Sequence, residues 1–193
     1  MDLTAPWYRS WQHLWSKVTR LNFLEWESKS AMLASLRPVG VRVVIVGEDA
    51  EAPREYYTFS MAEVGLPLKI AVISSGLGSQ PAALLLRKID RAVVGYDCSL
   101  AWIDTVTASN AATTRLNGVF FEFLPTGSDE EIVVIHELGA IRLKKDGAEV
   151  WFVDTDIVEG FTLDQAGNLL LAVADQAAKL HVEMTSGRVS KAV

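Results

Sequence analysis

The sequence predicts an α+β protein that is mainly β, with an N-terminal helical region followed by an antiparallel sheet of hairpins. In residues 1–38 the apolar side chains recur at helical spacing. From residue 41 onward, short β-branched and aromatic segments alternate with Gly, Pro and Asp turns. A chain of 193 residues fits one domain, so we expect residues 1–38 and 41–193 to form a single folded unit. The hairpins are expected to build a sandwich or a partial propeller.

The first expected helix carries three tryptophans on one face. Trp7, Trp11 and Trp15 recur every four residues, which places their indoles in one stripe. Aromatic side chains bury large areas and also anchor interfaces, so this face either packs on the sheet or binds a partner. A second helix is expected over about residues 25–36, because Pro38 ends it.

The β region begins after Gly40, where β-branched residues become frequent. Residues 82–94 fit two interpretations. Leu85, Ile89 and Val93 have the spacing of a helix, whereas residues 82–86 and 92–94 fit two strands around a polar turn. The hairpins that follow favour the strand pair. Further strands are expected at residues 41–46, 56–59, 68–73, 118–124, 149–153 and 161–163.

Acidic residues recur at a nearly constant interval in the second half of the chain. Asp97, Glu137 and Asp175 lie 40 and then 38 residues apart, and each one separates two strand candidates. A period near 40 residues with paired strands is typical of the blades of a β-propeller. We therefore expect consecutive antiparallel hairpins that repeat with this period.

Two turn-and-strand segments add to this pattern. Residues 146–151, Asp-Gly-Ala-Glu-Val-Trp, and residues 185–189, Thr-Ser-Gly-Arg-Val, resemble the endings of blades in quinoprotein-type propellers. Residues 93–189 thus resemble propeller-blade-like β-hairpin repeats, which implies a partial propeller for about half of the chain. The resemblance assigns no cofactor-binding residue.

The acidic charge is concentrated in the second half of the chain. The net charge is −6, and residues 98–193 hold 14 of the 24 acidic residues but 7 of the 18 basic ones. Between Asp146 and Asp164 there are six acidic residues and no Lys or Arg. Such a surface repels phosphate backbones, so nucleic acid is not expected as a partner, whereas a basic protein is attracted. The residues that we expect to meet this protein are Asp154, Asp156 and Glu159.

No apolar run reaches the length of a membrane span, and the first residues lack the pattern of a secretory signal. The cytoplasm is therefore the expected compartment. The single cysteine, Cys98, excludes an internal disulfide. It follows the negatively charged Asp97, which disfavours a thiolate, so we expect Cys98 to be buried and inert.

Three motifs invite a chemical interpretation, and none meets its requirements. Gly76 and Gly78 follow a strand as in a phosphate-binding loop, but the position of the third glycine is Pro81. His136 and Glu137 are adjacent in a strand and therefore point to opposite faces. We expect no catalytic residue, no cofactor and no metal.

The acidic pair Asp154 and Asp156 is the third of these motifs. In a strand the two carboxylates share one face, as in a calcium site, but the spacing of an EF-hand loop is absent. An exposed acidic strand end is therefore expected.

These observations predict a non-catalytic cytoplasmic protein-binding module that uses an acidic surface. A small acidic domain without catalytic motifs has the general profile of a bacterial toxin-neutralising immunity protein. One alternative is an enzyme that binds a small ligand or nucleotide through the Gly76/Gly78 loop or through His136/Glu137. Another is a structural subunit that forms homo-oligomers through the tryptophan helix. The expected protein-binding residues are Asp154, Asp156, Glu159, Trp7, Trp11 and Trp15.

Overall fold

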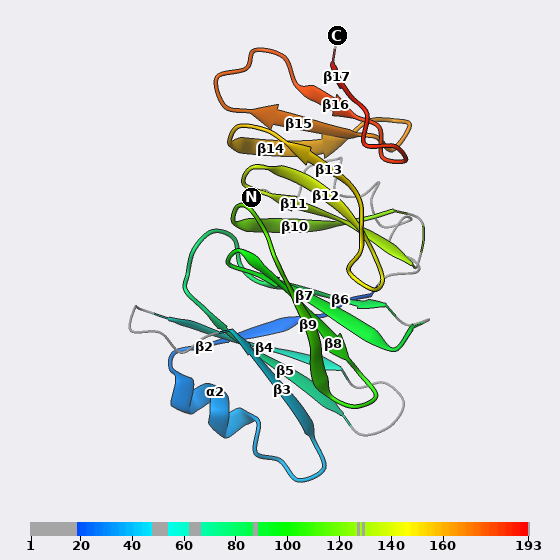
Figure 1. Ribbon diagram of the computed structural model, residues 1–193. Coiled ribbons are helices and arrows are strands. Elements are labelled where there is room, and N and C mark those ends of the chain that lie inside the picture. The colour runs from blue at the N-terminus through cyan, green and yellow to red at the C-terminus, as the bar shows by residue number, and fades with distance from the viewer. Residues whose placement is uncertain are drawn as a thin grey trace.

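The computed structural model describes residues 19–47, 54–61, 67–86, 89–126, 128 and 130–192. Over these residues it shows four β-sheets stacked one on another, with a helix against the outer face of the first sheet (Figure 1). No helix among the described residues is long and apolar enough to cross a membrane. The helix is α2 (Lys29–Ser35), and the strands are β1 (Thr19–Arg20), β2 (Phe23–Trp26), β3 (Arg42–Gly47), β4 (Glu55–Met61), β5 (Leu68–Ser74), β6 (Ala82–Leu86), β7 (Arg91–Tyr96), β8 (Ser99–Asp104), β9 (Ser109–Arg115), β10 (Phe120–Pro125), β11 (Glu131–His136), β12 (Gly139–Lys144), β13 (Glu149–Asp154), β14 (Val158–Leu163), β15 (Leu169–Val173), β16 (Leu180–Val182) and β17 (Val189–Lys191).

The first sheet has the order β2-β4-β5-β3 and is mixed. Strand β3 runs parallel to β5, while β2 and β4 pair antiparallel. Ser28 precedes helix α2, and its Oγ accepts a hydrogen bond from the Ala31 amide at 3.2 Å and so caps the helix. Met32 and Leu36 then pack on the sheet through Ala71 and Ile73.

The other three sheets are meanders of consecutive antiparallel strands. Their orders are β6-β7-β8-β9, with β1 added beside β6, then β10-β11-β12-β13, and finally β14-β15-β16-β17. The strand interpretation of residues 82–94 is confirmed, because β6 pairs with β7 in antiparallel register. The mainly β fold is confirmed as well, in a propeller-like arrangement of separate four-stranded units rather than one extended sheet.

Each gap between neighbouring sheets is filled by a layer of apolar side chains. Strands β6, β7 and β8 are buried on both faces of their sheet, so neighbouring residues of β6 belong to different layers. Ala83 and Leu85 pack against the first sheet, while Leu84 and Leu86 pack against the β10–β13 sheet. A third layer joins that sheet to the β14–β17 sheet. Burial on alternating faces therefore explains why residues 82–86 are uniformly apolar.

The expected N-terminal helical region needs correction. Residues 1–18 lie outside the described residues, and the helix expected at 25–36 begins only at Lys29. Phe23–Trp26 is a strand, held by pairing with β4 and by the Trp26 Nε1 hydrogen bond to Thr58 Oγ1 at 3.0 Å. Tertiary pairing has overridden the weak local helix preference of this segment.

The predicted period has a structural counterpart at the junctions between sheets. Asp97 and Glu137 each lie in the turn between the second and third strands of a meander. Their carbonyls accept hydrogen bonds from the first residue of the following sheet, from the Phe120 amide at 2.6 Å and from the Val158 amide at 2.7 Å. Asp175 occupies the same turn of the last sheet. Two of the three acidic positions, Asp97 and Glu137, thus mark points where one sheet is joined to the next.

A tryptophan–glycine contact ties the last two sheets together. Trp151 of β13 donates from Nε1 to the Met184 carbonyl at 3.1 Å, and Arg142 donates to the same carbonyl. Gly187 lies against the indole, since a Cβ on this glycine would lie 2.7 Å from Trp151 Cγ. The β16–β17 turn therefore depends on a residue without a side chain at position 187.

We expect Gly187→Ala to destabilise the protein more than Gly167→Ala does. Both glycines have positive φ, +72° and +84°, so both substitutions incur the cost of left-handed backbone, about 1–2 kcal/mol. Only Gly187 faces an indole, because nothing lies within 4 Å of a Cβ at Gly167. In Gly187→Ala the clash should lower the free energy of unfolding by a further amount of about 1–3 kcal/mol, as measured by urea unfolding. Equal losses of unfolding free energy in the two variants would show that Gly187 does not pack closely against Trp151.

Candidate functional site

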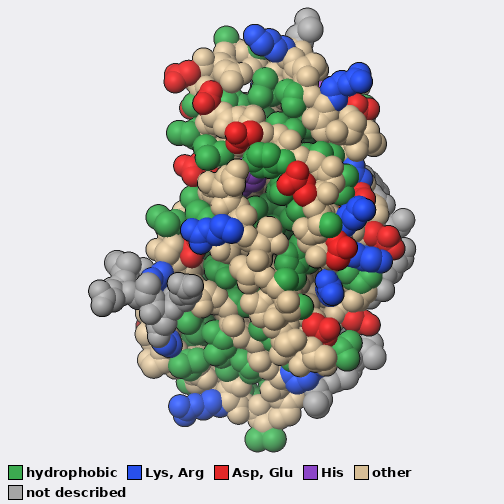
Figure 2. Space-filling view, in the orientation of Figure 1, with side chains coloured by type: hydrophobic (Ala, Val, Ile, Leu, Met, Phe, Trp, Pro, Cys, Tyr) green, Lys and Arg blue, Asp and Glu red, His purple; other side chains and the backbone are tan. Residues whose placement is uncertain are grey.

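The predicted acidic contact residues lie together on the linker between β13 and β14. Asp154 ends β13, Asp156 lies in the linker and Glu159 lies at the start of β14, and all three are exposed. Ile157 lies among them with 52% of its surface exposed. We call Asp154, Asp156, Ile157 and Glu159 the junction surface. Figure 2 shows acidic side chains gathered along the upper left edge of the molecule, over the last two sheets.

Backbone hydrogen bonds hold this linker at both of its ends. The Thr155 amide donates to the Leu138 carbonyl at 3.0 Å, and the Ile157 carbonyl accepts from the Ala174 amide at 2.8 Å. The linker is thus attached to the β11–β12 turn on one side and to the β15–β16 turn on the other. The junction surface has a backbone that is fixed before any partner binds.

The remaining acidic residues of the 146–164 stretch lie elsewhere. Asp146 and Glu149 precede or begin β13, and Asp164 follows β14, so they lie at the opposite strand ends from Asp154. Strand β13 ends at Asp154, so Asp156 does not share a strand face with it, contrary to the expectation from sequence. Among the described residues no group of three or more His, Cys, Asp or Glu side chains has a geometry that holds a metal ion. Trp7, Trp11 and Trp15 lie outside the described residues.

The Gly76/Gly78 loop is occupied by the protein's own groups. The Ser75 amide donates to the Asp97 carboxylate at 2.9 Å, and the Gly76 amide donates to Ser74 Oγ at 3.0 Å. The loop leads into strand β6, so the helix N-terminus of a phosphate site is absent at this point. A Cβ on Gly78 would lie 1.8 Å from Val119 Cγ1, so this glycine allows the loop to pack on the next linker.

Strand β11 ends at His136, and Glu137 begins the turn that follows. Glu137 lies in the turn after β11, where Oε2 accepts a hydrogen bond from the Val119 amide at 3.4 Å. His136 ends β11 and is fully buried. Cys98, expected to be buried, is half-buried instead, because it lies in the β7–β8 turn at the sheet end.

The ring of His136 has one hydrogen-bonded nitrogen and one without a partner. Nδ1 accepts from the Leu138 amide at 3.3 Å, which places the proton of the neutral ring on Nε2. Nε2 is buried and has no hydrogen-bond partner among the described residues. The ring lies parallel to that of Phe152, with the centroids 5.8 Å apart. Burial lowers the pKa of His136 below its ordinary value of 6.5, although Asp154 and Glu137 oppose this shift.

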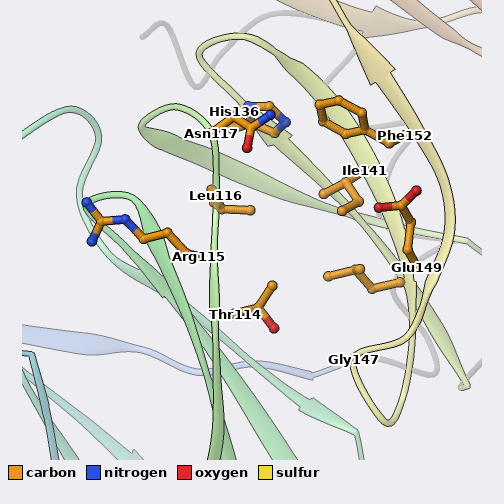
Figure 3. A pocket seen from close by; sticks show the side chains of 10 residues that line it. Thr114, Arg115, Leu116, Asn117, His136, Ile141, Gly147, Glu149 and Phe152 are labelled. Carbon is orange, nitrogen blue, oxygen red and sulfur yellow. The ribbon is translucent and has the colours of Figure 1, made fainter.

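His136 lines a cavity of about 200 Å³ between the β6–β9 and β10–β13 sheets (Figure 3). One wall comes from the end of β9 and the residues after it, and the other comes from β12 and β13. In Figure 3 His136 and Asn117 lie at one end of the cavity and Gly147 lies at the other. The sequence did not single out this cavity. The lining residues are Thr114, Arg115, Leu116, Asn117, His136, Ile141, Leu143, Gly147, Glu149 and Phe152.

No protein-family model matches the sequence, and no curated protein matches it. Solved structures with a related shape include Kluyveromyces lactis Hsv2, at 10% identity and a TM-score of 0.37, covering 70% of this chain and 58% of that one. A second is a protein of unknown function from Bacteroides caccae, at 14% identity and a TM-score of 0.37, covering 78% of this chain and 60% of that one. The chain thus spans less than two thirds of the length of these proteins. The fold is defined by the strand order of its four sheets.

We expect the buried His136 to make folding sensitive to acid. Its pKa is lowered on folding, so between that pKa and 6.5 the unfolded chain binds a proton that the folded chain does not. The stability contributed by the neutral ring is complete above 6.5 and is lost as the pH falls through the folded pKa.

Urea unfolding between about pH 5 and pH 8 measures this contribution. The free energy of unfolding of the wild type should fall more steeply below pH 6.5 than that of His136→Phe. Parallel profiles for the two proteins would show that His136 does not resist protonation.

Proposed function

We propose that the protein is a non-catalytic protein-binding module whose contact surface is the junction surface. The observation that carries this proposal is the combination of three exposed carboxylates with an exposed Ile157 on one linker. Burial of apolar surface is the main favourable contribution to most protein association, and surrounding charges supply steering and specificity. At the other end of β13, beside Glu149, the exposed apolar residue is the smaller Val150, which is 38% exposed against 52% for Ile157.

The fixed backbone of the linker favours binding. Ordering a loop on association costs free energy, and a surface that is already ordered avoids that cost. Hydrogen bonds from Thr155 and to Ile157 hold the linker against two neighbouring turns. The junction surface is therefore suited to a partner with a rigid complementary face.

The expected partner is a basic protein. The junction surface holds three carboxylates within six residues, which attract Lys and Arg side chains over a Debye length, about 8 Å at physiological ionic strength. A basic toxin is one such partner, in keeping with the immunity-like profile of the sequence. The alternative of an enzyme that uses the Gly76/Gly78 loop gains no support, because the Ser75 amide of this loop already donates to the Asp97 carboxylate. Oligomerisation through Trp7, Trp11 and Trp15 remains a hypothesis.

Neutralising the junction surface should slow association with a basic partner purified from the host. In Asp154→Asn, Asp156→Asn, Glu159→Gln the on-rate at low salt should fall by about tenfold, and its dependence on ionic strength should weaken. Stability should change little, because exposed charges contribute about 0–1 kcal/mol each. Stopped-flow kinetics at low and physiological salt measure this effect.

The matched control is the triple variant Glu25→Gln, Glu27→Gln, Glu130→Gln. It removes the same number of negative charges at exposed positions away from the junction surface. It should keep most of the on-rate. Equal on-rates for the two triple variants would mean that overall charge, and not the junction surface, attracts the partner.

A second variant, Ile157→Ser, should speed dissociation while leaving the on-rate nearly unchanged.

A further inference from the structure

Leu77 is a large apolar side chain that the fold holds in solvent. It lies in the linker between β5 and β6 with 57% of its surface exposed. Contacts on both sides fix the backbone of this loop, because the Ser75 amide donates to the Asp97 carboxylate at 2.9 Å and Gly78 packs against Val119. A loop that is already fixed loses little conformational entropy when a partner covers its leucine.

A series of contacts connects this loop to the junction surface. Val119, against which Gly78 packs, accepts a hydrogen bond through its carbonyl from the Glu137 amide at 2.8 Å. The Glu137 carbonyl in turn accepts from the Val158 amide at 2.7 Å, and Val158 follows Ile157. The loop, the turn and the linkers therefore form one continuous surface, which we call the linker end. It consists of the linkers 75–81, 116–119 and 155–157 and the turns 97–98, 137–138 and 174–179.

The linker end combines negative charge with two apolar points. Its segments hold four acidic residues and one basic residue, Lys179. Leu77 and Ile157 are the two large hydrophobic side chains in these segments that have more than half of their surface exposed. Carboxylates attract Lys and Arg side chains, and exposed apolar groups favour a partner that covers them. The surface therefore matches a basic partner that brings apolar residues to two separate points.

The distance between the two apolar points indicates the kind of segment that fits. Leu77 lies between the first and second sheets and Ile157 lies between the third and fourth, so about 20 Å separates them, since stacked sheets lie about 10 Å apart. A helix presents residues fourteen positions apart on one face, about 21 Å along its axis. An extended strand fits less well, because strand addition requires a free strand edge, whereas the linker end consists of turns and linkers.

We propose that the linker end binds a basic amphipathic helix, two of whose apolar residues contact Leu77 and Ile157 while its Lys and Arg side chains face the carboxylates. This inference rests on the proposed function, because the junction surface forms one side of the linker end. It adds the Leu77 loop as a second point of contact, and it names a helix as the part of the partner that binds.

Two synthetic peptides of identical composition test this spacing. Both are fluorescently labelled helices of about 18 residues built from alanine, lysine and two leucines. The leucines are fourteen residues apart in the long-spaced peptide and seven apart in the short-spaced peptide, and both spacings keep them on one helix face. Only the long-spaced peptide reaches Leu77 and Ile157 together. The full-length protein should therefore bind it about fivefold more tightly, as measured by fluorescence anisotropy at low salt.

Substitution of either apolar residue should abolish the difference in affinity between the two peptides. Leu77→Ser and Ile157→Ser each leave one apolar point, so both peptides should bind these variants equally. The matched control is Leu24→Ser, which should retain the fivefold difference. Leu24 is as exposed as Leu77, at 60%, but it lies on β2 outside the linker end.

The triple variant Asp154→Asn, Asp156→Asn, Glu159→Gln separates this inference from the proposed function. Equal affinities of the wild type for the two peptides, or a difference that persists in Leu77→Ser, would overturn the helix across the linker end. If the triple variant then still weakens both peptides, the junction surface remains the site that attracts a basic partner. If the triple variant weakens neither peptide, the proposed function fails together with this inference.

Discussion

The stacking of the three meander sheets depends on a backbone hydrogen bond that recurs at both of their junctions. The residue that begins the later sheet donates its amide to a carbonyl in the second turn of the earlier one, as Phe120 does to Asp97 and Val158 does to Glu137. Backbone groups make this bond, so it constrains spacing and not side-chain identity. The spacing fixes where each sheet starts, and the apolar layers then fill the gaps between the sheets.

Both candidate sites follow from these junctions. The junction surface lies on the linker that the Glu137 carbonyl and the Leu138 carbonyl hold in place. The cavity lies where the linker after β9 leaves room between two sheets, with His136 one residue before the same turn. The linker between the last two sheets thus presents exposed carboxylates, while the cavity lies between the β6–β9 and β10–β13 sheets.

The sequence identified features that depend on local chemistry and spacing. The acidic turns at 97, 137 and 175 were found from their period, and β6 and β7 were chosen over a helix from the hairpins that follow. The polar strand β9 was missed, because Ser109–Arg115 is almost wholly exposed and carries no apolar alternation. The parallel pairing of β3 with β5 was missed because it joins segments that are separated by another strand.

The same distinction applies to the sites. Asp154, Asp156 and Glu159 were predicted because their charges are visible in the sequence, whereas the exposure of Ile157 depends on the fold. His136 was noticed as a residue type, but its unpartnered Nε2 results from burial between two sheets. The position of Asn117 on a linker could have been predicted from the repeat, since Asn117 lies 39 residues before Asp156. Its place beside the cavity required the packing of the sheets.

Native-state hydrogen exchange at the junction amides tests the central role of these bonds most directly. The amides of Phe120 and Val158 lie at strand starts, where fraying ordinarily gives fast exchange. If the junction bonds hold the stack together, both amides should be protected as strongly as those at the centre of β11. Exchange as fast as that of the exposed Leu77 loop would show that the sheets are joined by their apolar layers alone, which would contradict the account.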